Sequence, residues 1–168
     1  EAGIRSFDTS MPEEINRIVT DSICDHFFTT SEVANRHLRQ SGVDEKRIHF
    51  VGNTMIDTLY QNLDRLQQPE IWSQFGLSTA EYFLVTLHRP ANVDDPYKLK
   101  TMLDAILDGT GDFPIVFPVH PRTRQKLEVI KYSHPRLLQV EPVGYLEFIY
   151  MVKNAKGVIT DSGGITEE

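Results

Sequence analysis

Polar and charged residues stand directly after three of the apolar runs in this sequence. His88 and Arg89 follow one run, His120 follows a second, and Asp161 with Ser162 follows a third. In parallel α/β sheets, ligands bind at the carboxyl ends of the strands. One histidine at a strand end is usually structural. Two at the same edge favour a shared anionic ligand, because Arg89, Arg122 and Arg124 are close by in the sequence.

The turn after the last apolar run has the composition of a phosphate-binding loop. Ser162, Gly163 and Gly164 lie between that run and the point where a helix is expected to begin. Glycines let the backbone approach a ligand closely, the first N–H groups of a helix attract anions, and the serine adds a donor. A diphosphate fits such a site; a tight turn with a serine cap is the alternative. Glu168, one turn further on, could bind ribose hydroxyls.

Carboxylates cluster near the start of the chain. Two carboxylates with different environments can divide the acid and base roles of a proton transfer. Glu1, Glu13 and Glu14 are the candidates. Glu14 is the most easily explained as a glutamate that stabilises the first turn of a helix. Spacing alone does not select Glu1 and Glu13 from the rest.

Two further features bear on ligand chemistry. Phe148 belongs to a helical pattern of apolar residues, so core packing is its default role, and contact with a nucleobase is the alternative. The sequence has no His-x-x-x-His pattern and no cysteine pair, so we predict neither a metal site nor a cofactor.

The elements that must position these residues alternate between strand and helix patterns, which predicts βαβ units and parallel sheets. A boundary is expected near residues 53–70, where Gln67-Gln68-Pro69 interrupts a helical pattern. The expected strands are 25–30, 48–51, 83–87, 115–119, 137–140 and 158–160, and the expected helices are 12–19, 32–39, 55–66, 96–107, 123–131 and 145–153.

Composition narrows the class of protein. The 168 residues carry a formal net charge of −7, which argues against nucleic acid as a partner. No apolar run is long enough to span a bilayer, so no membrane association is expected. The one cysteine, Cys24, cannot form an internal disulfide, which fits a reducing cytoplasm. Both ends of the sequence resemble cuts, and we expect an internal fragment.

An ordered set of motifs goes beyond generic patterning and covers essentially the whole chain. Together these motifs resemble the non-hydrolysing UDP-N-acetylglucosamine 2-epimerases. They are Glu1-Ala-Gly-Ile-Arg-Ser, Met11-Pro-Glu-Glu-Ile-Asn-Arg17, Val51-Gly-Asn-Thr54 with Ile56-Asp57, Val85-Thr-Leu-His-Arg89 with Asn92, Pro118-Val-His-Pro121, and Thr160-Asp-Ser-Gly-Gly-Ile165 with Glu167-Glu168.

The resemblance implies a GT-B type α/β fold with two Rossmann-like domains and parallel sheets, and an active site in the cleft between the domains. Only part of each domain would be present. Residues 1–55 would form the C-terminal part of the first domain, and residues 56–168 the first part of the second, UDP-binding domain. The isolated piece is therefore expected to have little or no turnover.

The reaction implied by the resemblance interconverts UDP-N-acetylglucosamine and UDP-N-acetylmannosamine without NAD or metal. UDP is eliminated to give 2-acetamidoglucal, and it adds back after a proton reaches the other face of C2. By motif, Glu1 and Glu13 would be the acid and base carboxylates, in an order left open. His88 would stabilise the diphosphate or donate a proton to it.

The remaining positions that carry over by motif are binding residues. Arg5, Phe148, Ser162, Gly163, Gly164 and Glu168 would contact the substrate. Arg89 and His120 match positions that contact a second, activating UDP-sugar in some bacterial members. Two departures from the family pattern weaken the expectation of allosteric activation. This chain has His88-Arg89-Pro90-Ala91-Asn92 where many members have further charged residues. Its loop between Arg5 and Pro12 is also shorter than in some bacterial enzymes.

Other functions stay open at this point. An epimerase acting on UDP-2,3-diacetamido uronic acids shares these motifs, and a GT-B glycosyltransferase also holds a nucleotide on a glycine-rich loop near glutamates. A non-catalytic binding or folding fragment is a third possibility. By resemblance, the full-length enzyme would be a cytoplasmic homodimer whose product serves surface polysaccharides.

Overall fold

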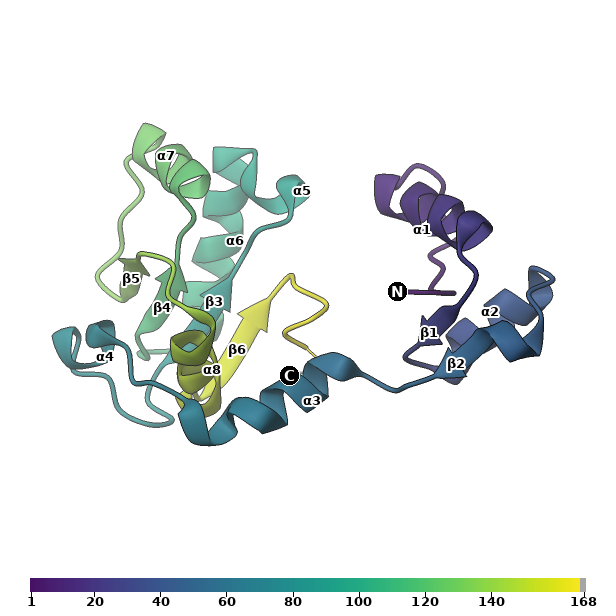
Figure 1. Ribbon diagram of the computed structural model, residues 1–168. Coiled ribbons are helices and arrows are strands. Elements are labelled where there is room, and N and C mark those ends of the chain that lie inside the picture. The colour runs from purple at the N-terminus through teal and green to yellow at the C-terminus, as the bar shows by residue number, and fades with distance from the viewer. Residues whose placement is uncertain (167–168) are drawn as a thin grey trace. The chain divides into compact units, whose positions relative to one another are not determined.

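The computed structural model describes residues 1–166, and it consists of two compact units (Figure 1). The first unit is Glu1–Tyr60 and the second begins at Gln61. The assignment of residues 1–55 and 56–168 to two Rossmann-like domains stays a prediction. Each unit is described here by itself.

The first unit is built around one βαβ motif. Strands β1 (Phe27–Thr29) and β2 (Ile48–Phe50) pair in parallel, and α2 (Glu32–Gln40) connects them, followed by the 3-10 helix η1 (Glu45–Arg47). Ser31 caps α2 by accepting a hydrogen bond from the Ala34 amide. Phe27, Ala34 and Leu38 are buried between the strands and this helix. Helix α1 (Pro12–Ile23) precedes β1, and α3 (Thr54–Asn62) follows β2.

The segment before α1 is held by two polar side chains, those of Asp21 and His37. The Gly3 amide donates to Asp21 of α1 at 3.0 Å, and Nδ1 of His37 lies 2.9 Å from the Gly3 carbonyl oxygen. Gly3 has φ +73°, and an added Cβ would lie 2.4 Å from the Ala34 carbonyl oxygen. A side chain at this position is therefore excluded both by backbone conformation and by space.

The second unit contains a four-stranded parallel sheet in the order β5-β4-β3-β6. Its strands are β3 (Phe83–Thr86), β4 (Ile115–Pro118), β5 (Leu137–Val140) and β6 (Gly157–Thr160). Its helices are α4 (Glu70–Gln74), α5 (Pro90–Val93), α6 (Pro96–Gly109), α7 (Pro121–Val129) and α8 (Tyr145–Asn154), with the short 3-10 helix η2 (Leu63–Arg65) before α4. The expected fold class, α/β with parallel sheets, is confirmed.

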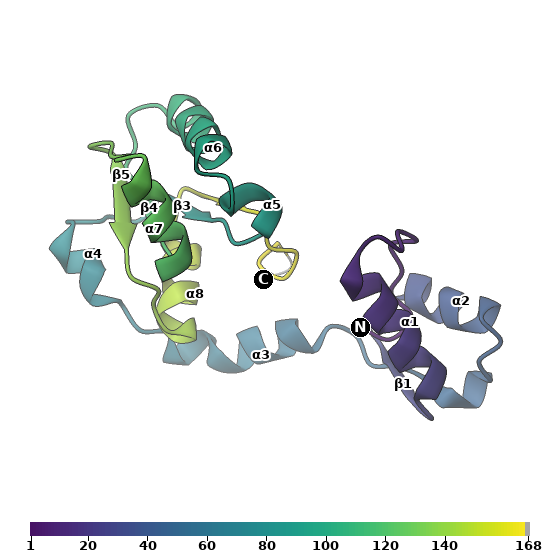
Figure 2. The ribbon, with the colours of Figure 1, turned by 90° about the horizontal axis from the view of Figure 1, so that it is seen from above.

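Helices cover both faces of this sheet, because alternate strand residues point to opposite sides. On one face, Leu103 of α6 and Leu127 of α7 pack with Val85 and Phe117. On the other face, α4 and α8 cover Leu84 and its neighbours (Figures 1 and 2). There, the ring of Trp72 lies edge-on to the rings of Tyr82 and Tyr150.

The strand order places a topological switch point between β3 and β6. The chain builds β3, β4 and β5 outward in one direction and then returns to add β6 on the other side of β3. Open parallel sheets bind ligands outside the carboxyl ends of the two strands at such a point. His88 follows β3 and Asp161 follows β6, so these residues lie at the position where a ligand is expected.

Several elements differ from those expected from the sequence. Helices α4 and α5 were not predicted; both are one-turn elements, too short to show helical periodicity. The helix predicted at residues 55–66 ends as an α-helix at Asn62 and continues as η2. The helix expected at residues 12–19 is α1, which extends to Ile23, and Glu14 is its buried residue.

Among the described residues, the structure has no helix with the length and apolar character to cross a membrane.

Candidate active site

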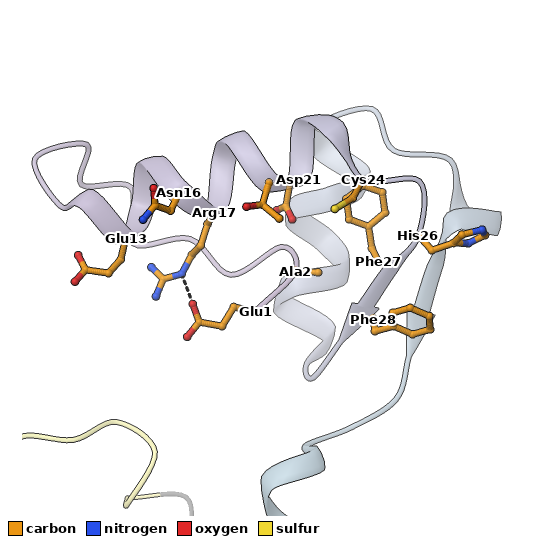
Figure 3. Close-up of a pocket in the computed structure, with 11 residues that line it drawn as sticks. Glu1, Ala2, Glu13, Asn16, Arg17, Asp21, Cys24, His26, Phe27 and Phe28 are labelled. Carbon is orange, nitrogen blue, oxygen red and sulfur yellow. Dashed lines mark hydrogen bonds and ion pairs between the residues drawn. The ribbon is translucent and has the colours of Figure 1, made fainter.

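Glu1 and Glu13 line one pocket of about 530 Å³ in the first unit (Figure 3). Glu13, Asn16, Arg17 and Thr20 have the spacing of neighbours on one helix face, and α1 directs them all toward the pocket. Glu1 reaches the pocket from the segment that precedes the helix. The volume is in the range of small-molecule sites.

Arg17 lies between the two carboxylates in Figure 3. Its Nε donates to Glu1 Oε2 at 2.8 Å, and its Nη1 lies 3.6 Å from Glu14 Oε2. The hydrogen bond from Arg17 lowers the pKa of Glu1 below its ordinary value, against the opposing effect of partial burial, and the charge of Arg17 adds to the lowering. Glu1 is thereby held in the ionised form, ready to accept a proton.

Glu14 is not among the residues that line this pocket, and its role goes beyond stabilising the first turn of the helix. The side chain is buried and accepts hydrogen bonds from the amides of Ser6 and Phe7, at 2.9 and 3.2 Å. The bond from Ser6 is the main reason that the pKa of Glu14 lies below its ordinary value. Glu14 therefore fixes the loop between Glu1 and α1.

Arg5 also contributes to this loop. Its Nη2 lies 2.6 Å from Asp21 Oδ2, and both side chains are only 9% exposed. The Asp21 carboxylate also accepts the hydrogen bond from the Gly3 amide. In the structure, then, Arg5 joins the loop to α1, and its expected contact with substrate stays a prediction.

A second group of predicted residues meets at the carboxyl edge of the second unit's sheet. His88 and His120 line one pocket of about 290 Å³, together with Arg122. Arg122 is paired with Asp94 at 2.8 Å, so its charge is partly balanced within the pocket. Arg124, which the sequence placed near the same ligand, instead pairs with Glu141 and lines a different pocket. Arg89 is exposed at the start of α5.

The Ser-Gly-Gly segment forms a turn at the end of β6. The Ser162 amide donates to Thr160 Oγ1 at 2.9 Å, and the turn runs through Gly163 and Gly164 to Thr166. A Cβ added at Gly163 would meet none of the described atoms within 4 Å. The predicted ribose contact of Glu168 lies outside the described residues.

Phe148 packs against the hydrophobic cluster that contains Tyr82 and Leu84, which agrees with its default role in the core. Its side chain is half-buried on α8, just after Gly144, which begins that helix. The structure thus leaves part of the ring accessible. Among residues 1–166, no three histidine, cysteine, aspartate or glutamate side chains gather as metal ligands would.

Two residues were missed as members of these sites. In the sequence, Arg17 stands out only as part of a motif, although it follows Glu13 by four positions and so lies on the same face of α1. Asp161 was treated as one more polar strand end. In the structure its carboxylate accepts hydrogen bonds from the amides of His88 and Arg89 and from Asn92, at 2.9 to 3.1 Å.

These features define an α/β protein with a parallel sheet in each of its two units. The sequence profile of the UDP-N-acetylglucosamine 2-epimerase family matches residues 1–168, and the chain belongs to that family. The resemblance expected from the motifs is confirmed.

Individual relatives agree with this assignment. The chain is 42% identical to a UDP-N-acetylglucosamine 2-epimerase of Methanocaldococcus jannaschii, and the match covers 100% of this chain and 49% of that protein. It is 39% identical to a UDP-2,3-diacetamido-2,3-dideoxy-D-glucuronate 2-epimerase of Pseudomonas aeruginosa, with 100% and 47% covered. The crystal structure of the M. jannaschii enzyme with UDP-GlcNAc and UDP superimposes with a TM-score of 0.83 over 99% of this chain and 48% of that one. The chain thus spans about half the length of these relatives.

Proposed function

We propose that the protein containing this chain epimerises UDP-N-acetylglucosamine at C2 to UDP-N-acetylmannosamine. The observation that carries the proposal is the pocket in which Glu1 and Glu13 flank Arg17. Epimerisation needs a base at the C2 proton and an acid on the other face of the same carbon, whereas glycosyl transfer needs an acceptor site instead. Membership of the epimerase family supports the same choice.

In the proposed reaction, one carboxylate removes the C2 proton while the C1–O bond to UDP breaks. The electrons of the C2–H bond form the C1–C2 double bond of 2-acetamidoglucal, and the electrons of the C1–O bond leave with UDP. The other carboxylate then gives a proton to the opposite face of C2, and the UDP oxygen adds back to C1. The order of Glu1 and Glu13 is a matter for experiment.

The second unit would handle the nucleotide and its charge. His88 would stabilise the negative charge that develops on the departing diphosphate. Ser162, Gly163 and Gly164 would hold phosphate through their amides, with Phe148 near the uracil. Arg5 and Glu168 are the remaining proposed substrate contacts. Arg89 and His120 are proposed for an activating UDP-sugar, and the pocket shared by His88 and His120 supports an anion there.

A second substrate has specific support. The 39% identity to the P. aeruginosa enzyme is close to the 42% identity to the M. jannaschii enzyme. UDP-2,3-diacetamido uronic acid is therefore the alternative substrate of the same reaction.

The test uses the full-length protein, UDP-N-acetylglucosamine and deuterated water, with proton NMR at C2. We expect deuterium at C2 and a new UDP-N-acetylmannosamine signal. Glu1→Gln and Glu13→Gln should each lower turnover by roughly 10²- to 10⁴-fold, the usual contribution of an acid or base. Glu45→Gln is the matched control, because Glu45 also accepts a hydrogen bond from an arginine Nε, at the surface.

Each outcome has a definite meaning. Exchange only with the diacetamido uronic acid would select the alternative substrate. An absence of exchange with both UDP-sugars would contradict the epimerase proposal, and release of UDP with transfer to an acceptor would establish a glycosyltransferase. Equal losses in all three glutamine variants would show that the pocket is not the reaction site.

We also propose that the full-length protein is a cytoplasmic homodimer. The single cysteine of this chain, which cannot form an internal disulfide, supports a reducing compartment. Light scattering on the full-length protein measures the oligomeric state directly.

A further inference from the structure

The carboxylate of Asp161 holds together the ends of two neighbouring strands. Asp161 follows β6, its side chain is only 9% exposed, and its partners belong to the loop that follows β3. Oδ2 accepts hydrogen bonds from the amide of Arg89 at 2.9 Å and from Nδ2 of Asn92 at 3.0 Å. The amide of His88 donates to both oxygens, at 3.0 and 3.1 Å. The carboxylate is therefore fixed independently of the His88 side chain.

The same carboxylate contacts the imidazole of His88. Nδ1 of His88 lies 2.7 Å from Asp161 Oδ1. An ionised carboxylate can only accept hydrogen bonds, so the proton of this contact must reside on Nδ1. In the neutral ring, Nε2 then carries the lone pair, and in the charged ring Nε2 is a second donor. The His88 side chain is 62% exposed, which leaves the rest of the ring accessible.

The environment keeps Asp161 ionised. Burial alone would raise the pKa of this carboxyl, but the hydrogen bonds from Asn92, Arg89 and His88 outweigh that effect and hold the pKa below its ordinary value. Asp161 is thus a permanent acceptor beside the ring, at the switch point between β3 and β6.

We propose that Asp161 is a positioning residue, which fixes His88 in the tautomer protonated at Nδ1 and thereby presents Nε2 to the departing diphosphate. The identity of the ligand rests on the proposed function, whereas the tautomer rests on the structure alone. When UDP leaves, the electron pair of the C1–O bond goes to the β-phosphate oxygen. The charged ring of His88 donates its Nε2–H to that oxygen, and the ionised carboxylate of Asp161 stabilises the positive charge of the ring.

The first test is ¹⁵N NMR of the full-length protein labelled at histidine, with the His88 signals identified by their loss in His88→Gln. At a pH where the ring is neutral, we expect Nδ1 to carry the proton. Asp161→Asn should shift the population toward Nε2–H, because an amide can donate to Nδ1. Asn92→Ala is the matched control: it removes a partner of the same carboxylate without touching His88 and should leave the tautomer unchanged.

Two results would overturn the proposal. One is an Nε2–H tautomer in the wild-type protein, a measurement that holds even if Asp161→Asn does not fold. The other is a folded Asp161→Asn variant with the wild-type tautomer.

The second test asks whether Asp161 acts through His88. Asp161→Asn should lower kcat by about 10²-fold with little change in KM, since removing the orienting partner of a functional histidine has effects of this order or larger. In a His88→Gln background, the same substitution should cost less than about threefold, because groups that act as a unit are not additive. An equal factor in both backgrounds would show that Asp161 serves only the fold.

If the wild-type protein turns over neither UDP-sugar, the proposed function fails, and the tautomer measurement still decides the role of Asp161.

Discussion

At the scale of single residues, the clearest asymmetry lies between two glutamates that share a pocket. Arg17 donates to Glu1 at 2.8 Å, and among the described contacts it makes no such bond to Glu13. Pairing with a cation favours the ionised carboxylate, and this pairing is the main cause of the lowered pKa of Glu1. The pair therefore sets the pH range in which Glu1 can accept a proton.

We predict that Arg17→Met raises the pKa of Glu1. In one direction of the reaction, Glu1 accepts the C2 proton and must be ionised. In that direction kcat/KM falls at low pH, where Glu1 becomes protonated. Because the substitution raises the pKa of Glu1, this fall in kcat/KM should occur at higher pH than in the wild type. The measurement is kcat/KM against pH for the full-length protein, with Arg39→Met as control because Arg39 pairs with Glu45 at the surface. An unmoved acid limb in Arg17→Met would contradict the prediction.

Glu14 gives a second prediction, for stability. Its folded-state pKa lies below the ordinary value of 4.5, so its contribution to stability is present above that value and is lost as the pH falls through the lowered pKa. The thermal unfolding temperature of the first unit should therefore drop as the pH falls below 4.5. Glu14→Gln should lower the unfolding temperature at neutral pH and weaken its dependence on acid pH.

Circular dichroism melts of the chain from neutral to acid pH check this prediction. Glu45→Gln, which removes one partner of an exposed ion pair, should have a smaller effect at neutral pH. Identical pH dependence in Glu14→Gln and the wild type would contradict a stabilising role of the buried carboxylate.

The sequence predicted these residues unevenly. The motifs singled out Glu1, Glu13 and His88 as candidates, because residue type and order in the chain are enough for a resemblance. The partners Arg17 and Asp161 could not be assigned, since a guanidinium or a carboxylate in a motif says nothing about which atom it meets. Those contacts depend on the face of α1 and on the pairing of β3 with β6.

At the scale of elements, the loop before α1 depends on one glycine. Gly3 lies at positive φ against α2, where a Cβ would be 2.4 Å from the Ala34 carbonyl oxygen and 2.8 Å from Leu38 Cγ. The loop carries Glu1, so the position of a proposed catalytic group depends on this close approach.

We predict that Gly3→Ala destabilises the first unit by about 2–4 kcal/mol, the sum of backbone strain and a forced displacement in a packed site. Gly42→Ala is the matched control, because Gly42 also has positive φ, +84°, but an added Cβ there meets nothing within 4 Å. Its cost should be about 1 kcal/mol, from the backbone alone. Chemical denaturation of both variants gives the comparison, and equal costs would contradict the close-approach argument.

Secondary structure was predictable where the pattern was long. Most strands and the longer helices follow from alternating apolar runs and helical spacing. Helices α4 and α5 were missed, because single turns depend on tertiary context rather than on periodicity. The burial of Glu14 in α1 could not be predicted in this way, because a glutamate in the first turn of a helix is ordinarily exposed.

At the scale of the whole molecule, the two units have unequal cores. Phe27, Ala34 and Leu38 form the small apolar core of the first unit, whereas the second has an apolar cluster on each face of its sheet. A small unit buries a smaller fraction of its surface and is correspondingly less stable. The family and the fold class were predictable at this scale, since they depend on the order of motifs along the chain.

We predict that the 168-residue chain unfolds in two transitions, with the first unit melting at the lower temperature. Differential scanning calorimetry measures both transitions. Leu103→Ala, in the core of the second unit, should lower only the upper transition, by about 2–5 kcal/mol of stability. A single transition with equal calorimetric and van't Hoff enthalpies would contradict independent unfolding.

The edge-on packing of Trp72 against Tyr82 and Tyr150 gives this chain a built-in optical reporter. Trp72 is the sole indole in the sequence, and it belongs to the second unit. Excitation at the red edge of indole absorption therefore selects fluorescence from that unit alone. The emission of Trp72 should move to longer wavelength when α4 and α8 separate from the sheet and water reaches the indole. Unfolding of the first unit should leave this emission unchanged. One fluorescence trace beside one calorimetric trace thus assigns each transition to its unit without any label.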